Sequence, residues 1–127
     1  MMYVKESQKS VSAAATDFEA AVKAGGFGVL HIYDLQATLQ SKGFELPHEC
    51  RIFEVCNPAQ AVAVLATDMA LNMALPCRVS VYEEGGATKI GMIRPTGFLK
   101  MLSSDPALGK TAEEVEAALC GMIDAAV

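Results

Sequence analysis

The distribution of apolar and polar positions divides the chain into short extended segments and longer helical ones. Runs of β-branched and aromatic residues with alternating polarity are typical of β-strands. We expect strands at 3–6, 27–33, 50–56, 77–83 and 87–94. The last two flank Glu84-Gly85-Gly86, a short glycine-containing connection that predicts a hairpin, so these two strands should be antiparallel neighbours.

Helices are predicted where apolar residues recur three or four positions apart. This spacing begins after Ser10 and stops at Gly25-Gly26, and it begins again after Asp34 and stops at Gly43. Ser and Asp are favoured N-caps because their side-chain oxygens accept hydrogen bonds from free amides of the first turn. We therefore expect one helix after Ser10 and a shorter one after Asp34.

A third helix is predicted after Asn57, because Asn is a favoured N-cap and Pro58 suits the first helical position. Apolar residues cover nearly all sides of this helix between 59 and 73, so we expect the helix to be buried. A short helix is expected at 95–102, after the hairpin.

The C-terminal segment predicts a last helix with one apolar face. Thr111 and Glu114 have the spacing of a capping box, so this helix should begin at Thr111. Pro106 and Gly109 are helix breakers and predict a loop across 103–110. Strands and helices in this order, within 127 residues, predict a single α+β domain that spans residues 1–127.

Composition and charge narrow the range of functions. Hydrophobic residues make up 52% of the chain, which is enough for a buried core and excludes disorder. The 15 Asp and Glu residues outnumber the 10 Lys and Arg residues, so the formal net charge is −5. This sign disfavours phosphate backbones and anionic lipid surfaces, and we expect no nucleic-acid partner.

Neither export nor membrane insertion is indicated. The chain becomes polar at Lys5, whereas a secretory signal needs a continuous apolar segment. The most apolar stretch, 59–75, is too short and too often interrupted by polar residues to span a bilayer. The four cysteines form no CxxC motif, which favours free thiols in a reducing cytoplasm.

Cys56 is the first candidate for chemistry, because it directly precedes the helix expected after Asn57. A thiol beside a helix N-terminus can have a lowered pKa and can then act as a nucleophile or carry sulfur. The alternative, which we favour, is a small buried hydrophobic residue that ends a strand, followed by an ordinary helix cap.

Cys77 could join Cys56 in a redox pair or a metal site. A helix that runs directly from one strand to the next would place the two thiols at opposite ends of the sheet. They can meet only if residues 71–76 run back along the helix, and a disulfide needs Cα atoms within about 7 Å. We therefore favour two separate thiols.

Two histidines are the other candidates. His31 and Tyr33 should share one face of their strand, where they could line a pocket together with Phe27 and Val29. The alternative is a partly exposed sheet face. His31 and His48 lack the spacing of a zinc site, so no metal is expected. The methionines, among them Met69, Met73, Met92, Met101 and Met122, are expected to fill gaps in the core.

Three segments carry a resemblance to a known family: Gly-Phe-Gly-Val-Leu at 26–30, Val-Cys-Asn-Pro-x-x-Ala at 55–61, and Leu-Pro-Cys-Arg-Val-x-Val-Tyr-Glu at 75–83. Over about residues 2–95 the sequence resembles the DUF302 family, small bacterial and archaeal proteins of unknown function. The resemblance implies a TBP-like α+β fold, with helices against a mostly antiparallel sheet of about five strands, and a homodimer. It implies no catalytic residue, and whether the protein uses a cofactor is unknown.

Three functions remain open at this point. The preferred hypothesis is a homodimer that binds a small ligand or a partner, with His31, Tyr33, Asn57 and Pro58 as binding residues. The first alternative is a thiol-dependent redox or sulfur-handling protein that uses Cys56, possibly with Cys77. The second is an interaction subunit with a large apolar face and no pocket. No catalytic motif indicates a particular reaction, and the ligand is not identified.

Overall fold

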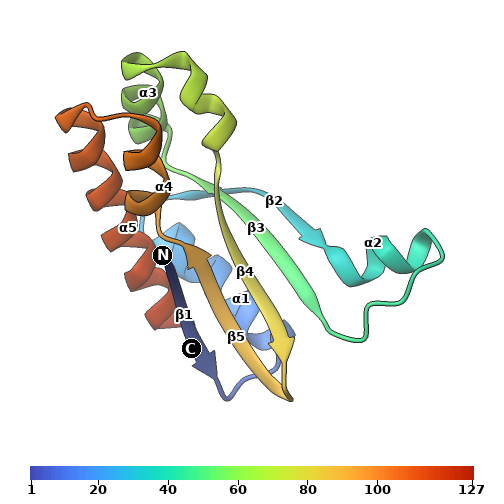
Figure 1. The fold of residues 1–127 in the computed structure, drawn as a ribbon. Coiled ribbons are helices and arrows are strands. Elements are labelled where there is room, and N and C mark those ends of the chain that lie inside the picture. The colour runs from blue at the N-terminus through green and yellow to red at the C-terminus, as the bar shows by residue number, and fades with distance from the viewer.

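A computed structural model describes residues 1–127, and its framework is one five-stranded sheet (Figure 1). The strands are β1 (Met2–Ser7), β2 (Gly28–Asp34), β3 (Cys50–Cys56), β4 (Cys77–Glu84) and β5 (Ala87–Ile93). Their order across the sheet is β1-β5-β4-β3-β2, and every neighbouring pair is antiparallel. The expected α+β fold with five strands is therefore confirmed.

The helices, with one exception, cover one face and one end of this sheet. They are α1 (Val11–Ala24), α2 (Leu35–Ser41), α3 (Pro58–Thr67), the 3₁₀ helix η1 (Met69–Ala74), α4 (Pro95–Leu102) and α5 (Pro106–Ala126). The exception is α2, which lies beyond the opposite end of β2 (Figure 1). α1 and α5 pack side by side against the same sheet face, while α3, η1 and α4 gather at one end (Figure 1). The opposite sheet face has no helix over it, and we refer to it as the open face.

The main core lies between the sheet and the pair α1 and α5. Phe18 of α1 and Phe53 of β3 meet at its centre, edge to face, with ring centroids 5.1 Å apart. A second, smaller core joins α3, η1, α4 and the first turns of α5. Its fully buried members are Val64, Leu71, Leu99, Leu108 and Ala112. The two cores together account for the amphipathic pattern of most elements.

Local signals in the sequence fix most element boundaries. The oxygens of Ser10, Asp34 and Asn57 accept hydrogen bonds from backbone amides three residues later, at 3.0–3.1 Å, so the three expected caps are confirmed. Gly85 and Gly86 form the hairpin turn with φ of 60° and 77°. Such angles are adopted by glycine at little cost, which is why the turn lies there.

The expectation of a buried helix after Asn57 is wrong. α3 ends at Thr67, and its only fully buried residue is Val64, whereas Val62 on another side is 69% exposed. The helix stops because Asp68 is extended and its carboxylate accepts from the Ala70 amide, at 2.9 Å, to begin η1. α3 lies at the end of the sheet, so only one of its sides can be covered.

The expected core role of the methionines also fails in part. Met92 and Met122 are buried in the main core. Met69, Met73 and Met101 are 63–83% exposed, because they lie on η1 and α4, which only partly cover the end of the sheet.

The last helix begins five residues earlier than expected. Asp105 caps it by accepting a hydrogen bond from the Ala107 amide, at 2.8 Å, and Pro106 occupies the first helical position. Gly109 lies inside the helix, where burial of the neighbouring Leu108 offsets its low helix propensity. The prediction of a capping box at Thr111 and Glu114 is therefore wrong, because the Thr111 hydroxyl donates a hydrogen bond to the Ala107 carbonyl.

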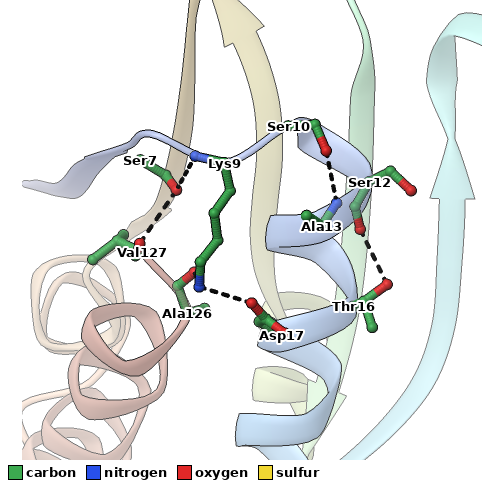
Figure 2. A network of polar contacts seen from close by, with 9 residues as sticks. All are labelled: Ser7, Lys9, Ser10, Ser12, Ala13, Thr16, Asp17, Ala126 and Val127. Atoms are coloured by element: carbon green, nitrogen blue, oxygen red, sulfur yellow. Dashed lines mark hydrogen bonds and ion pairs between the residues drawn. The ribbon is translucent and has the colours of Figure 1, made fainter.

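A polar network ties the C-terminus to the connection between β1 and α1 (Figure 2). The Lys9 ammonium donates to the Ala126 carbonyl at 2.9 Å and forms an ion pair with Asp17 at 2.7 Å. The Ser7 hydroxyl donates to the Val127 carbonyl at 3.4 Å and accepts from the Lys9 amide. These contacts provide partners for the last two carbonyls of the chain, Ala126 and Val127, and hold the end of α5 against the sheet.

Candidate small-molecule cavity

A cavity of about 250 Å³ opens between α3, α5 and the end of the sheet formed by β3 and β4. Twelve of its sixteen lining residues are hydrophobic, and none carries a charge. Ala61 of α3 and Ala112 of α5 contribute only methyl groups to its wall, so no side chain there fills the space. The cavity lies between the main and the smaller core, and Val55, Val64, Leu99 and Val115 line it.

Asn57 is part of this cavity, but its neighbour Pro58 is not. The Asn57 side-chain oxygen is engaged as the α3 cap, where it accepts from the Gln60 amide at 3.1 Å. Pro58 is exposed and does not line the cavity. Of the two residues predicted to bind a ligand here, only Asn57 lies in a position to contact one.

Gln60 is the polar residue that the sequence analysis missed. Its side-chain Oε1 is fully buried, has no hydrogen-bond partner, and belongs to a residue that lines the cavity. Nearly all buried polar atoms in folded proteins have a partner, so an exception calls for an explanation. The sequence does carry a signal for this residue, because Gln60 is a lone side-chain amide in the first turn of a helix that is otherwise mostly apolar.

Cys56 and Cys77 lie at the same end of the sheet, contrary to the favoured expectation. Cys77 begins β4 opposite Val55 of β3, so Cys56 is only one residue further along, and both thiols line the cavity. The chain returns to this end because η1 and the segment after it lead back from the end of α3. Both cysteines are free, and they lie on adjacent strands of the sheet.

The thiols are less acidic than the hypothesis of a nucleophilic cysteine beside a helix N-terminus requires. Burial raises the pKa of Cys56 above that of an ordinary thiol. Burial, together with the neighbouring Cys56, raises the pKa of Cys77 to about 11. Loss of solvation disfavours the thiolate. Both groups are therefore neutral at physiological pH, where they contribute weakly polar surface to the cavity wall.

His31 and Tyr33 lie elsewhere, on the open face. Their rings pack edge to face with centroids 4.3 Å apart, so they do share a face. Phe27 and Val29 point to the helix-covered side instead, because a β-bulge between Val29 and His31 shifts the register of β2. The prediction that these four residues line one pocket is therefore wrong.

The surroundings of Tyr33 are polar. The Glu54 carboxylate, as a hydrogen-bond partner and a nearby negative charge, raises the pKa of Tyr33, and Arg78 lies 6.0 Å from the ring centroid. His48 is exposed in the connection between α2 and β3. No group of three or more His, Cys, Asp or Glu side chains comes together, and no helix is both long and apolar enough to cross a membrane.

Fold and cavity together define a small α+β protein with a helix-covered antiparallel sheet and an uncharged cavity that opens at one end of the sheet. The chain belongs to the DUF302 family, described as "Domain of unknown function DUF302", whose sequence pattern matches residues 3–126. It is similar to the crystal structure of an uncharacterized conserved DUF302 protein from Bacillus stearothermophilus. That similarity has a TM-score of 0.93 and 35% identity, over 99% of this chain and 98% of the other. No curated protein matches the chain.

Proposed function

We propose that this protein binds a small, largely apolar molecule in the cavity between α3, α5 and the sheet. The observation that carries the proposal is the cavity itself, with hydrophobic walls and a few polar atoms, as is typical of small-molecule sites. An apolar cavity of about 150 Å³ is known to hold benzene. By that measure, 250 Å³ suits a ligand of roughly ten non-hydrogen atoms.

The thiol-dependent alternative has less support. A nucleophilic or redox-active cysteine needs an accessible thiolate, and the pKa values of Cys56 and Cys77 are shifted in the opposite direction. The four free cysteines do suit a reducing environment, so we place the protein in the cytoplasm.

Filling the cavity is expected to abolish binding. Ala61→Phe places a phenyl ring in the space that a ligand would occupy. We expect the Kd for toluene, followed through the NMR shifts of the Leu99 and Val115 methyl groups, to rise at least about tenfold, since an occupied cavity leaves no room for a second ring. The proposal fails if toluene shifts none of these methyl signals in the unmodified protein.

Val62→Phe is the matched control for this experiment. Val62 is the next residue of α3, is 69% exposed, and does not line the cavity. The same added ring should therefore leave the Kd for toluene unchanged. Equal weakening by both variants would indicate a general disturbance of α3 and would count against the cavity as the binding site.

A homodimer is the second part of the proposal, and the open face supports it. Three apolar side chains of this face, Met2, Val4 and Ile93, are 41–68% exposed. They border a groove of about 550 Å³ that runs across the sheet. Met73 of η1 lines the same groove and is 83% exposed. An exposed apolar surface of this kind is typical of a protein interface. A second copy of the chain would cover it in a two-fold arrangement.

Light scattering provides the test of the dimer. We expect a mass of about 27 kDa, twice the 13.4 kDa of one chain. Ile93→Lys should shift the mass toward that of one chain, because a lysine ammonium would have to be desolvated in the interface. Val62→Lys, an exposed residue outside the open face, is the control and should leave the dimer intact. A mass near 13.4 kDa for the unmodified protein at tens of micromolar would contradict the proposal.

A further inference from the structure

The groove on the open face contains two opposite charges that do not pair with each other. Glu54 of β3 and Arg78 of β4 are Cα partners in the register of these strands, and both line the groove. Opposite charges in such a cross-strand pair are close enough to interact. Neither residue, however, takes part in an ion pair. Both charges are therefore available to a ligand.

The surroundings of the two side chains leave their binding capacity free. Tyr33 of β2 is the hydrogen-bond partner of the Glu54 carboxylate, and β2 lies on the side of β3 away from Arg78. A carboxylate can accept several hydrogen bonds, so Glu54 keeps acceptor positions besides the one that Tyr33 occupies. The Arg78 side chain is exposed, and its guanidinium lies 6.0 Å from the Tyr33 ring centroid.

An apolar surface continues the groove beside these charges. Ser80 of β4 pairs with Gly91 of β5, so two residues further along the same antiparallel register Arg78 faces Ile93. Ile93 pairs in turn with Met2 of β1, and both of these side chains line the groove. Because neighbouring strands lie about 4.8 Å apart, the apolar surface extends roughly 10 Å from Arg78. The groove volume of about 550 Å³ is within the range of small-molecule sites.

We infer that this groove binds a zwitterionic α-amino acid with a large apolar side chain. Its carboxylate binds the Arg78 guanidinium, its ammonium binds the Glu54 carboxylate, and its side chain lies along Ile93 and Met2. A zwitterion satisfies both protein charges at once, because its own two charges are attached to one carbon atom, whereas a simple anion or cation leaves one of them unpaired.

This site is separate from the cavity between α3, α5 and the sheet, so the inference goes beyond the ligand proposed for that cavity. The groove lies on the open face, which has no helix over it. In the proposed homodimer the second copy would lie over the groove and enclose the amino acid.

L-Phenylalanine is the probe, and three analogues each lack one of its features. 3-Phenylpropanoate lacks the ammonium, 2-phenylethylamine lacks the carboxylate, and glycine lacks the apolar side chain. We expect the Kd of each analogue, followed through the NMR shifts of the Ile93 methyl groups, to be at least about fivefold higher than that of phenylalanine. This is the effect of losing one hydrogen bond to a charged group or one buried aromatic ring.

Substitution of each charge tests the two roles separately. Arg78→Gln should raise the Kd for phenylalanine at least about fivefold and should not weaken 2-phenylethylamine, which has no carboxylate. Glu54→Gln should abolish the preference for phenylalanine over 3-phenylpropanoate, because the ammonium loses its partner while the amide oxygen can still accept from Tyr33. Arg51→Gln and Glu83→Gln are the matched controls. They make the same charge changes on β3 and β4 outside the groove and should leave every Kd unchanged.

Two results would overturn the inference without touching the toluene experiment on the cavity. The first is an absence of phenylalanine binding, or binding of 3-phenylpropanoate as tight as that of phenylalanine. The second is a shift of the mass of Arg78→Gln toward that of one chain in light scattering, together with no methyl shifts on addition of phenylalanine to the unmodified protein. In that case Glu54 and Arg78 pair with a second copy of the chain and bind no amino acid.

Discussion

Phe53→Ala is expected to lower the free energy of unfolding by about 3–5 kcal/mol, the range for an aromatic residue deleted from a well-packed core. Phe53 is 1% exposed in the middle of the main core, and its ring packs edge to face on Phe18. β3 is held between β2 and β4, so the surrounding backbone cannot easily move in to close the space. Urea titration followed by circular dichroism provides the measurement.

Phe44→Ala is the control for this prediction. Phe44 is the same residue type but is 69% exposed in the connection after α2. Its deletion should change the free energy of unfolding by less than about 0.5 kcal/mol, as is usual for surface positions. A loss below about 1 kcal/mol for Phe53→Ala would show that the packing of this core is looser than the contact with Phe18 implies.

Alkylation of folded Cys77 is expected to accelerate with pH up to about pH 11, the pKa that burial and the neighbouring Cys56 give to this thiol. An ordinary cysteine has a pKa of about 8.5, so its alkylation levels off near pH 9. Near neutral pH the raised pKa lowers the thiolate fraction by roughly two orders of magnitude, of which about one is recovered through greater nucleophilicity. We therefore expect iodoacetamide to react at least about tenfold more slowly with folded Cys77 than with the unfolded chain.

The measurement uses a variant in which Cys77 is the only cysteine, with circular dichroism to show that it remains folded at each pH. Cys56 no longer contributes in this variant, but burial, the larger cause, still raises the pKa of Cys77, so the rate should continue to rise beyond pH 9. The folded protein holds the Cys77 proton more tightly than the unfolded chain does. The contribution of this thiol to stability is therefore complete below about pH 8.5 and is lost as the pH rises toward 11. The same variant in guanidinium chloride is the control, and its rate should level off near pH 9. A rate that levels off near pH 9 in the folded protein as well would mean that Cys77 is a normal, accessible thiol and would restore the thiol-dependent alternative.

These results bear on different parts of the molecule. The Phe53 experiment tests the core that holds the sheet against α1 and α5. The Cys77 experiment tests the burial of a cavity wall, on which the preference for ligand binding over thiol chemistry depends. A normal thiol together with an intact core would therefore shift the interpretation from a binding protein to a thiol protein without changing the fold.

The sequence alone determined the features that depend on neighbouring residues. Ser10, Asp34 and Asn57 cap helices through bonds to amides three residues away, and Gly85-Gly86 forms the hairpin turn with its own backbone angles. These interactions span only a few residues, so the spacing of residue types is enough to predict them. The family could be identified for a similar reason, because its motifs are short continuous segments.

Tertiary structure decided the features that depend on residues far apart in the chain. α5 begins at Pro106 because Leu108 is buried among residues of α3, η1 and α4, a gain that no pattern within 103–110 reveals. The return of the chain through η1 brings Cys77 next to Cys56, and the bulge in β2 places His31 on the open face. The cavity is lined by residues of separate strands and helices, among them the small side chains of Ala61 and Ala112. Burial of this kind is a property of the assembled fold, so the sequence alone could not reveal it.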